Sequence, residues 1–138
     1  MARLTLEQTH RELGIGTYVE KPIKFRGKDG KETGGEVLIL VASYDEILKA
    51  GDVWKLKNKA DITIDQLKKA LIFQTVYEDE GKKFFPKIDE VGRLSSELVE
   101  VLYKAADEVL DFSGKNSISN QMTSSGASLS STESEAEQ

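Results

Sequence analysis

The clearest hydrophobic pattern in the chain lies between residues 98 and 112. After Ser95, apolar residues recur with helical spacing, and charged residues occupy the other side of the same stretch. The apolar positions are Leu98, Val101, Leu102, Ala105, Val109 and Phe112. A serine directly before such a run is a good N-cap, and Gly114 offers a left-handed stop. The pattern predicts a helix that begins at Ser95 or Ser96 and runs to Phe112.

Three further helix starts carry the capping-box spacing, in which a serine or threonine precedes a glutamate or glutamine by three positions. They are Thr5-x-x-Gln8, Ser43-x-x-Glu46 and Thr63-x-x-Gln66. After Thr63, apolar residues continue with helical spacing as far as Val76. The helix after Ser43 is expected to be short, because Gly51 follows closely.

Between the first two predicted helices the pattern changes to that of β-strands. Residues 18–25 alternate loosely, and residues 36–41 are apolar and β-branched. Residues 27–35 are rich in turn formers and include Asp29-Gly30, so we expect a β-hairpin with a long, mobile tip. The predicted fold class is α+β, in which a small antiparallel hairpin or sheet is followed by helices that cover one face.

The composition changes at Ser113. Residues 113–138 contain nine serines and three glutamates but almost no large apolar residues. Such a segment cannot bury enough apolar surface to offset the entropy of ordering it. The 138-residue chain is therefore expected to form a single folded domain over residues 1–112, followed by a disordered Ser/Glu-rich tail over residues 113–138.

Charge and composition argue against several classes of partner. The net charge is −5, and acidic residues surround the basic stretches Lys21–Lys31 and Lys55–Lys59, so we expect no nucleic-acid partner. No apolar run approaches the ~20 residues of a membrane span, and we expect neither a membrane partner nor a signal peptide. The absence of cysteine excludes disulfides and thiolate sites and suits a reducing compartment.

Catalytic chemistry has little support in the residues. His10 is the only histidine and lies among polar residues, and no Ser/His/Asp set can be assembled around it. The acidic stretch Glu78–Gly81 is interpreted as a turn, because its glycine comes too early for a calcium-binding loop and two lysines follow. The adjacent carboxylates of Asp89 and Glu90 could serve acid–base catalysis, but no sequence pattern around them indicates a binding pocket. We therefore expect no enzyme, no cofactor and no metal.

Aromatic residues in charged loops are the candidates for a protein interface. Trp54 lies between two predicted helices, and Phe84 and Phe85 lie in a loop flanked by lysines. Large aromatic side chains often anchor protein–protein contacts. The other interpretation is that they close the ends of the core, with Phe84 and Phe85 pointing in opposite directions.

One segment and the order of the elements resemble phage tail assembly chaperones of long, non-contractile tails. In that family a helix often ends in an acidic D-G-K-x-x-F turn, and an acidic link leads into a final helix. Here the turn is Glu80-Gly81-Lys82-Lys83-Phe84-Phe85, with Glu80 where aspartate is commoner. The resemblance covers roughly Pro22 to Gly114 and does not include the predicted helix from Thr5 to Leu13.

The resemblance implies a non-enzymatic protein of the host cytoplasm that is absent from the mature virion. Such a chaperone binds the tape measure protein, recruits tail tube subunits, and forms homo-oligomers. It also forms mixed oligomers with a longer product of a −1 ribosomal frameshift. A slippery site could encode Gly114-Lys115-Asn116, or Ser113-Gly114-Lys115, where the predicted domain ends.

Two other functions fit the same residues. The chain could be another small phage tail or connector protein, which would remain in purified particles. It could also be a non-viral protein-interaction domain whose serine-rich tail is switched by phosphorylation.

Overall fold

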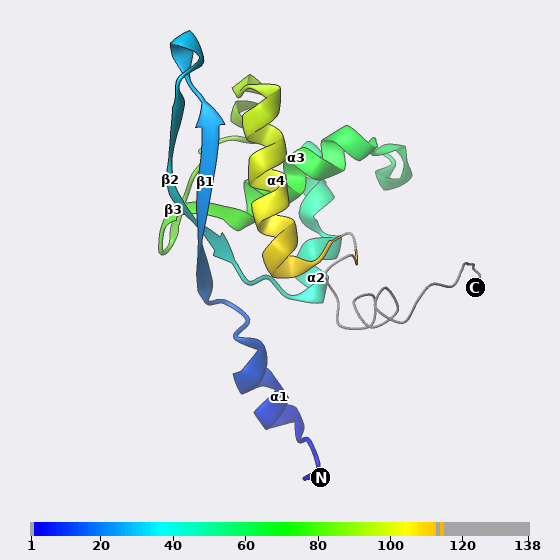
Figure 1. Ribbon diagram of the computed structural model, residues 1–138. Coiled ribbons are helices and arrows are strands. Elements are labelled where there is room, and N and C mark those ends of the chain that lie inside the picture. The colour runs from blue at the N-terminus through cyan, green and yellow to red at the C-terminus, as the bar shows by residue number, and fades with distance from the viewer. Residues whose placement is uncertain (1, 113, 115–138) are drawn as a thin grey trace, which may run out of the picture.

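A computed structural model describes residues 2–112 and 114 of the chain (Figure 1). The helices are α1 (Leu6–Leu13), α2 (Tyr44–Leu48), α3 (Ile64–Thr75) and α4 (Ser96–Leu110), and the strands are β1 (Tyr18–Arg26), β2 (Glu32–Leu40), β3 (Val76–Asp79) and β4 (Lys82–Lys83). Short 3-10 helices connect them: η1 (Lys28–Gly30), η2 (Ala50–Trp54), η3 (Lys59–Asp61) and η4 (Ile88–Arg93). The strands form one antiparallel sheet in the order β1-β2-β3-β4, which confirms the α+β class. Except for Gly114, the predicted tail lies outside the described residues.

The four helices begin at the predicted caps. The side chains of Thr5, Ser43, Thr63 and Ser95 each accept a hydrogen bond from the backbone N–H three residues later, at 3.0–3.2 Å. The helices after Ser43 and Thr63 have complete capping boxes, because the glutamate or glutamine side chain also accepts the N–H of the cap residue. These starts were predictable because every atom of the cap lies within one helical turn.

The end of α4 differs from the prediction. The helix ends at Leu110, and the left-handed residue that closes it is Asp111, with φ of 56°. The N–H of Asp111 donates to the Asp107 carbonyl at 2.6 Å. Gly114 is also left-handed, with φ of 77°, but it lies beyond the helix. An aspartate tolerates this conformation better than most residues, so the glycine was not needed as the stop.

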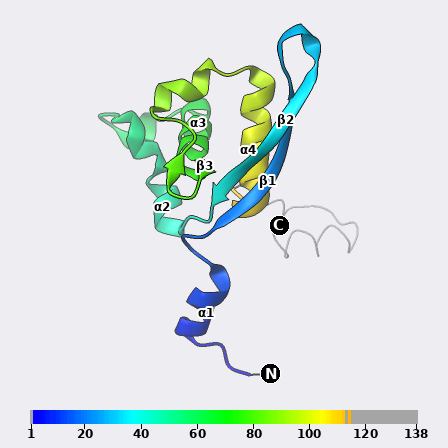
Figure 2. The same ribbon diagram turned by 90° about the vertical axis from the view of Figure 1, so that its left-hand side faces the viewer.

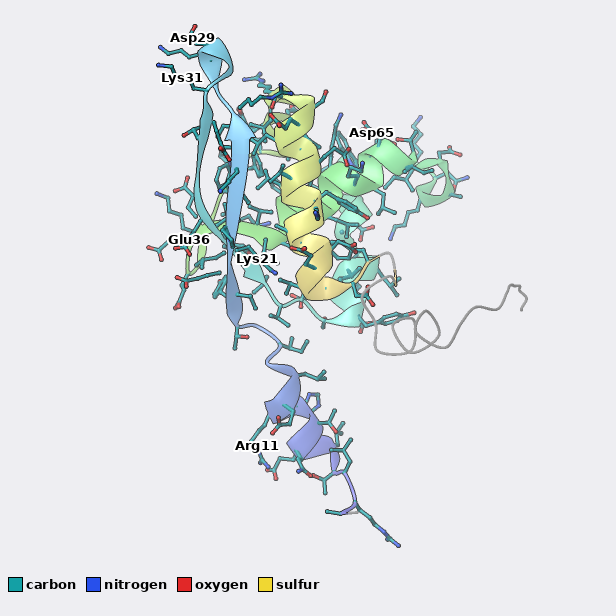
Figure 3. All side chains as sticks on the ribbon, viewed as in Figure 1. Arg11, Lys21, Asp29, Lys31, Glu36 and Asp65 are labelled. Atoms are coloured by element: carbon teal, nitrogen blue, oxygen red, sulfur yellow. The ribbon has the colours of Figure 1, made fainter. Side chains whose placement is uncertain are left out.

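The β1–β2 hairpin is longer and its tip shorter than predicted. The strands pair continuously from Tyr18 with Leu40 to Arg26 with Glu32. The reversal is confined to residues 27–31, where Asp29 and Gly30 both have positive φ, as their turn signal indicated. The expected tip over residues 27–35 is therefore wrong in extent. Its last four residues belong to β2 because their backbone pairs with β1, and Figure 3 shows Asp29 and Lys31 at the far end of the hairpin.

Strands β3 and β4 were not predicted. They enclose the acidic turn, in which Gly81 has φ of 76° and donates its N–H to the Tyr18 hydroxyl at 3.0 Å. The expectation of a turn at Glu78–Gly81 is confirmed at Glu80 and Gly81 but is wrong at Glu78 and Asp79, which belong to β3. The strands themselves hold only four and two residues, which is too short for an alternating pattern to be recognised.

The main core lies between the sheet and helices α3 and α4, which occupy the same side of the β1–β2 hairpin (Figure 2). Its fully buried side chains include Ile39, Ile72, Val76, Val91 and Leu102. A smaller cluster, formed by Ala50, Ala70 and Leu71, lies where η2 packs against α3. The other end of the molecule is different, because α1 has no buried residue and extends away from the body (Figure 1, Figure 2).

Two half-buried tyrosines give the fold a pH dependence. Burial raises the pKa of Tyr77 and of Tyr103 above the ordinary value of 10.0. Glu46 acts in the same direction on Tyr77 and Asp107 does so on Tyr103, where the Lys68 ammonium acts against them. Because the folded pKa exceeds the unfolded one, the stabilisation is complete below about pH 10 and is lost as the pH rises through the folded pKa. The free energy of unfolding, measured in urea, should therefore decrease as the pH is raised above about 10. The decline should be shallower in the Tyr77→Phe/Tyr103→Phe variant, and an unchanged slope would contradict the assignment.

Candidate functional site: an apolar groove

An apolar groove lies between α2, η2, η3 and the first turns of α3. Its volume is about 230 Å³. Its lining residues are Leu48, Gly51, Asp52, Lys55, Leu56, Lys59, Ile62 and Leu67. A cavity of about 150 Å³ lined by apolar side chains can take up a benzene molecule, so this groove has room for an aliphatic side chain of a partner.

Local sequence signals fix the walls of the groove. The Ser43 capping box starts the short helix that carries Leu48, and the Thr63 capping box starts the helix that carries Leu67. Between them, the Asn58 side chain accepts the N–H of Ala60 at 3.0 Å and begins η3. The groove is thus built from short elements, each ended by its own cap or turn.

The leucines at the groove are exposed to solvent. Leu48 is 64% and Leu67 is 40% exposed. One helical turn away, Tyr44 on α2 is 77% and Ile64 on α3 is 87% exposed. Single exposed hydrophobic residues are ordinary, but two exposed leucines that line an apolar groove form a surface of the kind that binds other proteins.

Charged side chains border the apolar surface. Asp52 and Lys59 form an ion pair at 3.1 Å. Lys55 lies at the end of η2 with a left-handed backbone, φ 53°, and takes part in no ion pair within the described part of the chain. The lining therefore carries an excess of positive charge, which favours an acidic flank on whatever binds there.

Trp54 ends η2 but does not line the groove. Its side chain packs against the Ala50, Ala70 and Leu71 cluster, and its indole Nε1–H donates to the Gln66 carbonyl at 2.7 Å. The hydrogen bond ties η2 to the first turn of α3. In this position the tryptophan supports the wall of the groove.

Replacing Trp54 by phenylalanine should lower the free energy of unfolding by about 1–2 kcal/mol, because a hydrogen bond and part of the buried ring are lost. Urea denaturation followed by circular dichroism measures the change. Tyr44→Phe, at an exposed position, is the control and should leave stability unchanged. Equal stability of the tryptophan variant would show that the indole is not part of the packing.

Phe84 and Phe85 lie in a different part of the molecule. Their rings contact each other, with centroids 4.9 Å apart. Phe85 is only 3% exposed and belongs to the main core, while Phe84 is half-buried and packs against it. The structure therefore does not bring these residues together with Trp54, and the Phe85 ring is not available to a partner in this conformation.

The turn that carries the family resemblance is held by contacts within the chain. Lys82 forms an ion pair with Glu78 at 3.1 Å. The amine of Lys83 lies 4.3 Å from the centre of the Phe73 ring, and burial lowers the pKa of this lysine. The residues of this turn thus join β3 and β4 to α3 and the core.

The remaining candidates lie apart from the groove. His10 and Asp89 are exposed, and the Glu90 carboxylate accepts a hydrogen bond from the Arg93 guanidinium at 3.5 Å. In the part of the chain that the structure describes, no group of three or more histidine, aspartate or glutamate side chains could hold a metal ion, and no helix is long and apolar enough to cross a membrane. Of the frameshift candidates, Gly114 is described, whereas Lys115 and Asn116 lie outside the described residues.

Sequence reasoning did not find the groove. Leu67 belongs to the helical apolar pattern after Thr63, and Leu48 belongs to the short helix after Ser43, but neither pattern indicates a groove. The one local signal is the number of apolar residues, including Leu56 and Ile62, in a stretch of turns and lysines. Comparison with protein-family models, with curated proteins and with solved structures gives no match.

Proposed function

We propose that this protein is a non-enzymatic phage tail assembly chaperone whose groove holds an amphipathic helix of the tape measure protein. The observation that carries the proposal is the apolar groove with exposed Leu48 and Leu67 and a lysine-rich border. The resemblance of the turn at residues 80–85 to that family supplies the biological setting.

The physical logic concerns solubility. A tape measure protein is a long helical chain whose apolar surface would aggregate before the tail tube surrounds it. Small apolar grooves can cover such a helix one side chain at a time, in the helix-in-groove mode. Each contact is weak, but several copies bound along one helix hold it with high total avidity and still release it to the arriving tube subunits.

The proposal also specifies where the protein acts and a longer protein made from the same gene. The protein acts in the host cytoplasm, forms homo-oligomers, and is absent from the mature virion. A longer form arises by a −1 frameshift at the codons for residues 113–116 and joins the same oligomers. A slippery heptamer followed by an open −1 frame in the coding nucleotides supports this, and codons that cannot slip contradict it.

The groove is tested by binding. Full-length protein is mixed with the tape measure protein of the same genome, and the complex is quantified by analytical ultracentrifugation. We expect the Leu48→Ser/Leu67→Ser variant to bind at least tenfold more weakly, because burying one exposed leucine side chain is worth about 1.5–3 kcal/mol and tenfold corresponds to about 1.4 kcal/mol. Val19→Ser removes an exposed apolar side chain on β1, outside the groove, and should bind normally. If the groove variant and the Val19→Ser control bind equally well, the tape measure protein binds to another surface of this protein.

Particle composition separates the proposal from the connector alternative. Mass spectrometry of purified virions should detect the tail tube protein but not this chain. Stoichiometric presence of the chain in virions would favour a structural tail or connector protein.

A further inference from the structure

The exposed hydrophobic side chains fall into two groups. Among the described residues, nine large hydrophobic side chains are exposed. Four belong to the N-terminal segment: Leu4, Leu6, Leu13 and Ile15. Two line the groove, Leu48 and Leu67, and two more, Tyr44 and Ile64, lie one turn away on the same helices; the remaining one is Val19. The chain therefore presents an unpartnered apolar helix and an apolar groove at separate places.

The apolar side chains of α1 form a stripe along one face of the helix. Leu6 and Leu13 are seven positions apart, which places them on the same face. They are 73% and 56% exposed. An isolated helix of eight residues is only marginally stable in water, because helices shorter than ~12–15 residues need tertiary packing. The helix thus requires a surface to pack against.

The connection to β1 directs α1 away from its own body. Gly16 donates its N–H to the Val41 carbonyl, and Val41 donates to the Thr17 carbonyl, each at 2.8 Å. Gly14 ends the helix with φ of 67° and accepts the N–H of Thr17. Both ribbon views show α1 pointing away from the sheet and the other helices (Figure 1, Figure 2). In this conformation α1 therefore has no buried residue and does not pack on its own body.

The charges of α1 and the groove are complementary. At 3.6 residues per turn, Glu7 and Glu12 lie about 110° to either side of the leucine stripe, whereas Arg11 lies about 150° from it. The groove presents Lys55 and Lys59 beside its apolar lining. Glu7 already contacts Arg11 at 3.5 Å, but this pair is exposed and such pairs contribute little. The glutamates can therefore turn to the lysines when the leucines are buried.

We propose that α1 of one copy docks in the groove of a second copy, with the Leu6–Leu13 stripe against Leu48 and Leu67. The contact joins two different surfaces, so it is head-to-tail and builds a ring or an open chain. This inference rests on the proposed function in one respect, namely that the groove accepts an amphipathic helix. A contact this small is weak and reversible, and a client helix that enters the groove displaces α1.

Self-association of the full-length protein alone tests the proposal. In sedimentation velocity, the average mass of the wild type should rise with concentration. Leu6→Ser/Leu13→Ser should weaken association at least tenfold, and Leu48→Ser/Leu67→Ser should do the same. The matched control for the helix is Gln8→Ser/Arg11→Ser, which alters the opposite face and should assemble like the wild type. Circular dichroism verifies that each variant is folded.

Mixing the two defective variants gives the sharper result. The helix variant retains an intact groove, and the groove variant retains an intact α1. An equimolar mixture should therefore form dimers and stop there, because only one productive contact remains. A monomeric wild type, as expected if α1 folds onto its own groove, would overturn the inference. So would a mixture that stays monomeric or a helix variant that assembles normally.

The tape measure protein separates this inference from the proposed function. The helix variant should bind the tape measure protein at least as well as the wild type, since its groove is not occupied by α1. Binding to the tape measure protein by a chain that never self-associates would refute the α1 contact alone. Self-association through α1 without any such binding would refute the client assignment alone.

Discussion

Leu102→Ala should lower the free energy of unfolding by about 3–5 kcal/mol, which is a large part of the stability of a domain this small. The side chain is fully buried on α4 and belongs to the cluster that joins β1, β2, α3 and β3. Truncation leaves a cavity at the centre of that cluster, since sheet and helices cannot both collapse onto it. Urea denaturation with a constant m-value measures the loss.

The same truncation at Leu48 is the control for this result. Leu48 is 64% exposed, so Leu48→Ala should change stability little. A large effect at Leu48 would mean that the groove leucines maintain the fold, which would weaken their assignment to binding. A small effect at Leu102 would contradict the described core.

Gly34→Ala should destabilise the protein by about 1–3 kcal/mol, as expected for forcing an extra carbon into a packed site. Gly34 lies opposite Lys24 in the hairpin, and a Cβ there would overlap the backbone carbonyl of Ile23. Backbone atoms cannot move aside as a flexible side chain can, so the paired strands must separate locally.

Gly35→Ala is the matched control. Gly35 lies in the same strand, and a Cβ there meets nothing within 4 Å. Alanine also reduces the entropy of the unfolded chain, so this variant should be neutral or slightly more stable. Equal effects of the two substitutions in urea denaturation would show that general strand propensity, and not close approach of the backbones, decides the result.

These stability measurements bear on the function because they separate the apolar residues that stabilise the fold from those that are available for binding. The core residues are shared between the sheet and α3 and α4, whereas the hydrophobic side chains of α1 and the groove are exposed. If the exposed groove leucines can be removed without loss of stability, the fold does not require them and a role in binding is supported. The α1 stripe is subject to the same reasoning.

Local chemistry was the part of the fold that the sequence could predict. Caps such as Ser43 and Thr63 act within one turn, and the Asp29-Gly30 pair defines the hairpin reversal through its own backbone preferences. The α+β order followed from these signals and from the change of hydrophobic period. The last turn of α4 was less predictable, because Asp111 and Gly114 can both adopt the left-handed conformation found there.

The sequence by itself therefore determined where helices begin, where the hairpin turns, and the class of the fold, because each of these depends on neighbours within a few residues. Only the tertiary structure decided which apolar residues are buried. Leu67 and Leu71 share the apolar stripe of α3, yet Leu71 is 5% exposed under η2 and Leu67 is 40% exposed at the groove. That difference depends on which segments pack beside the helix, and no local pattern contains this information.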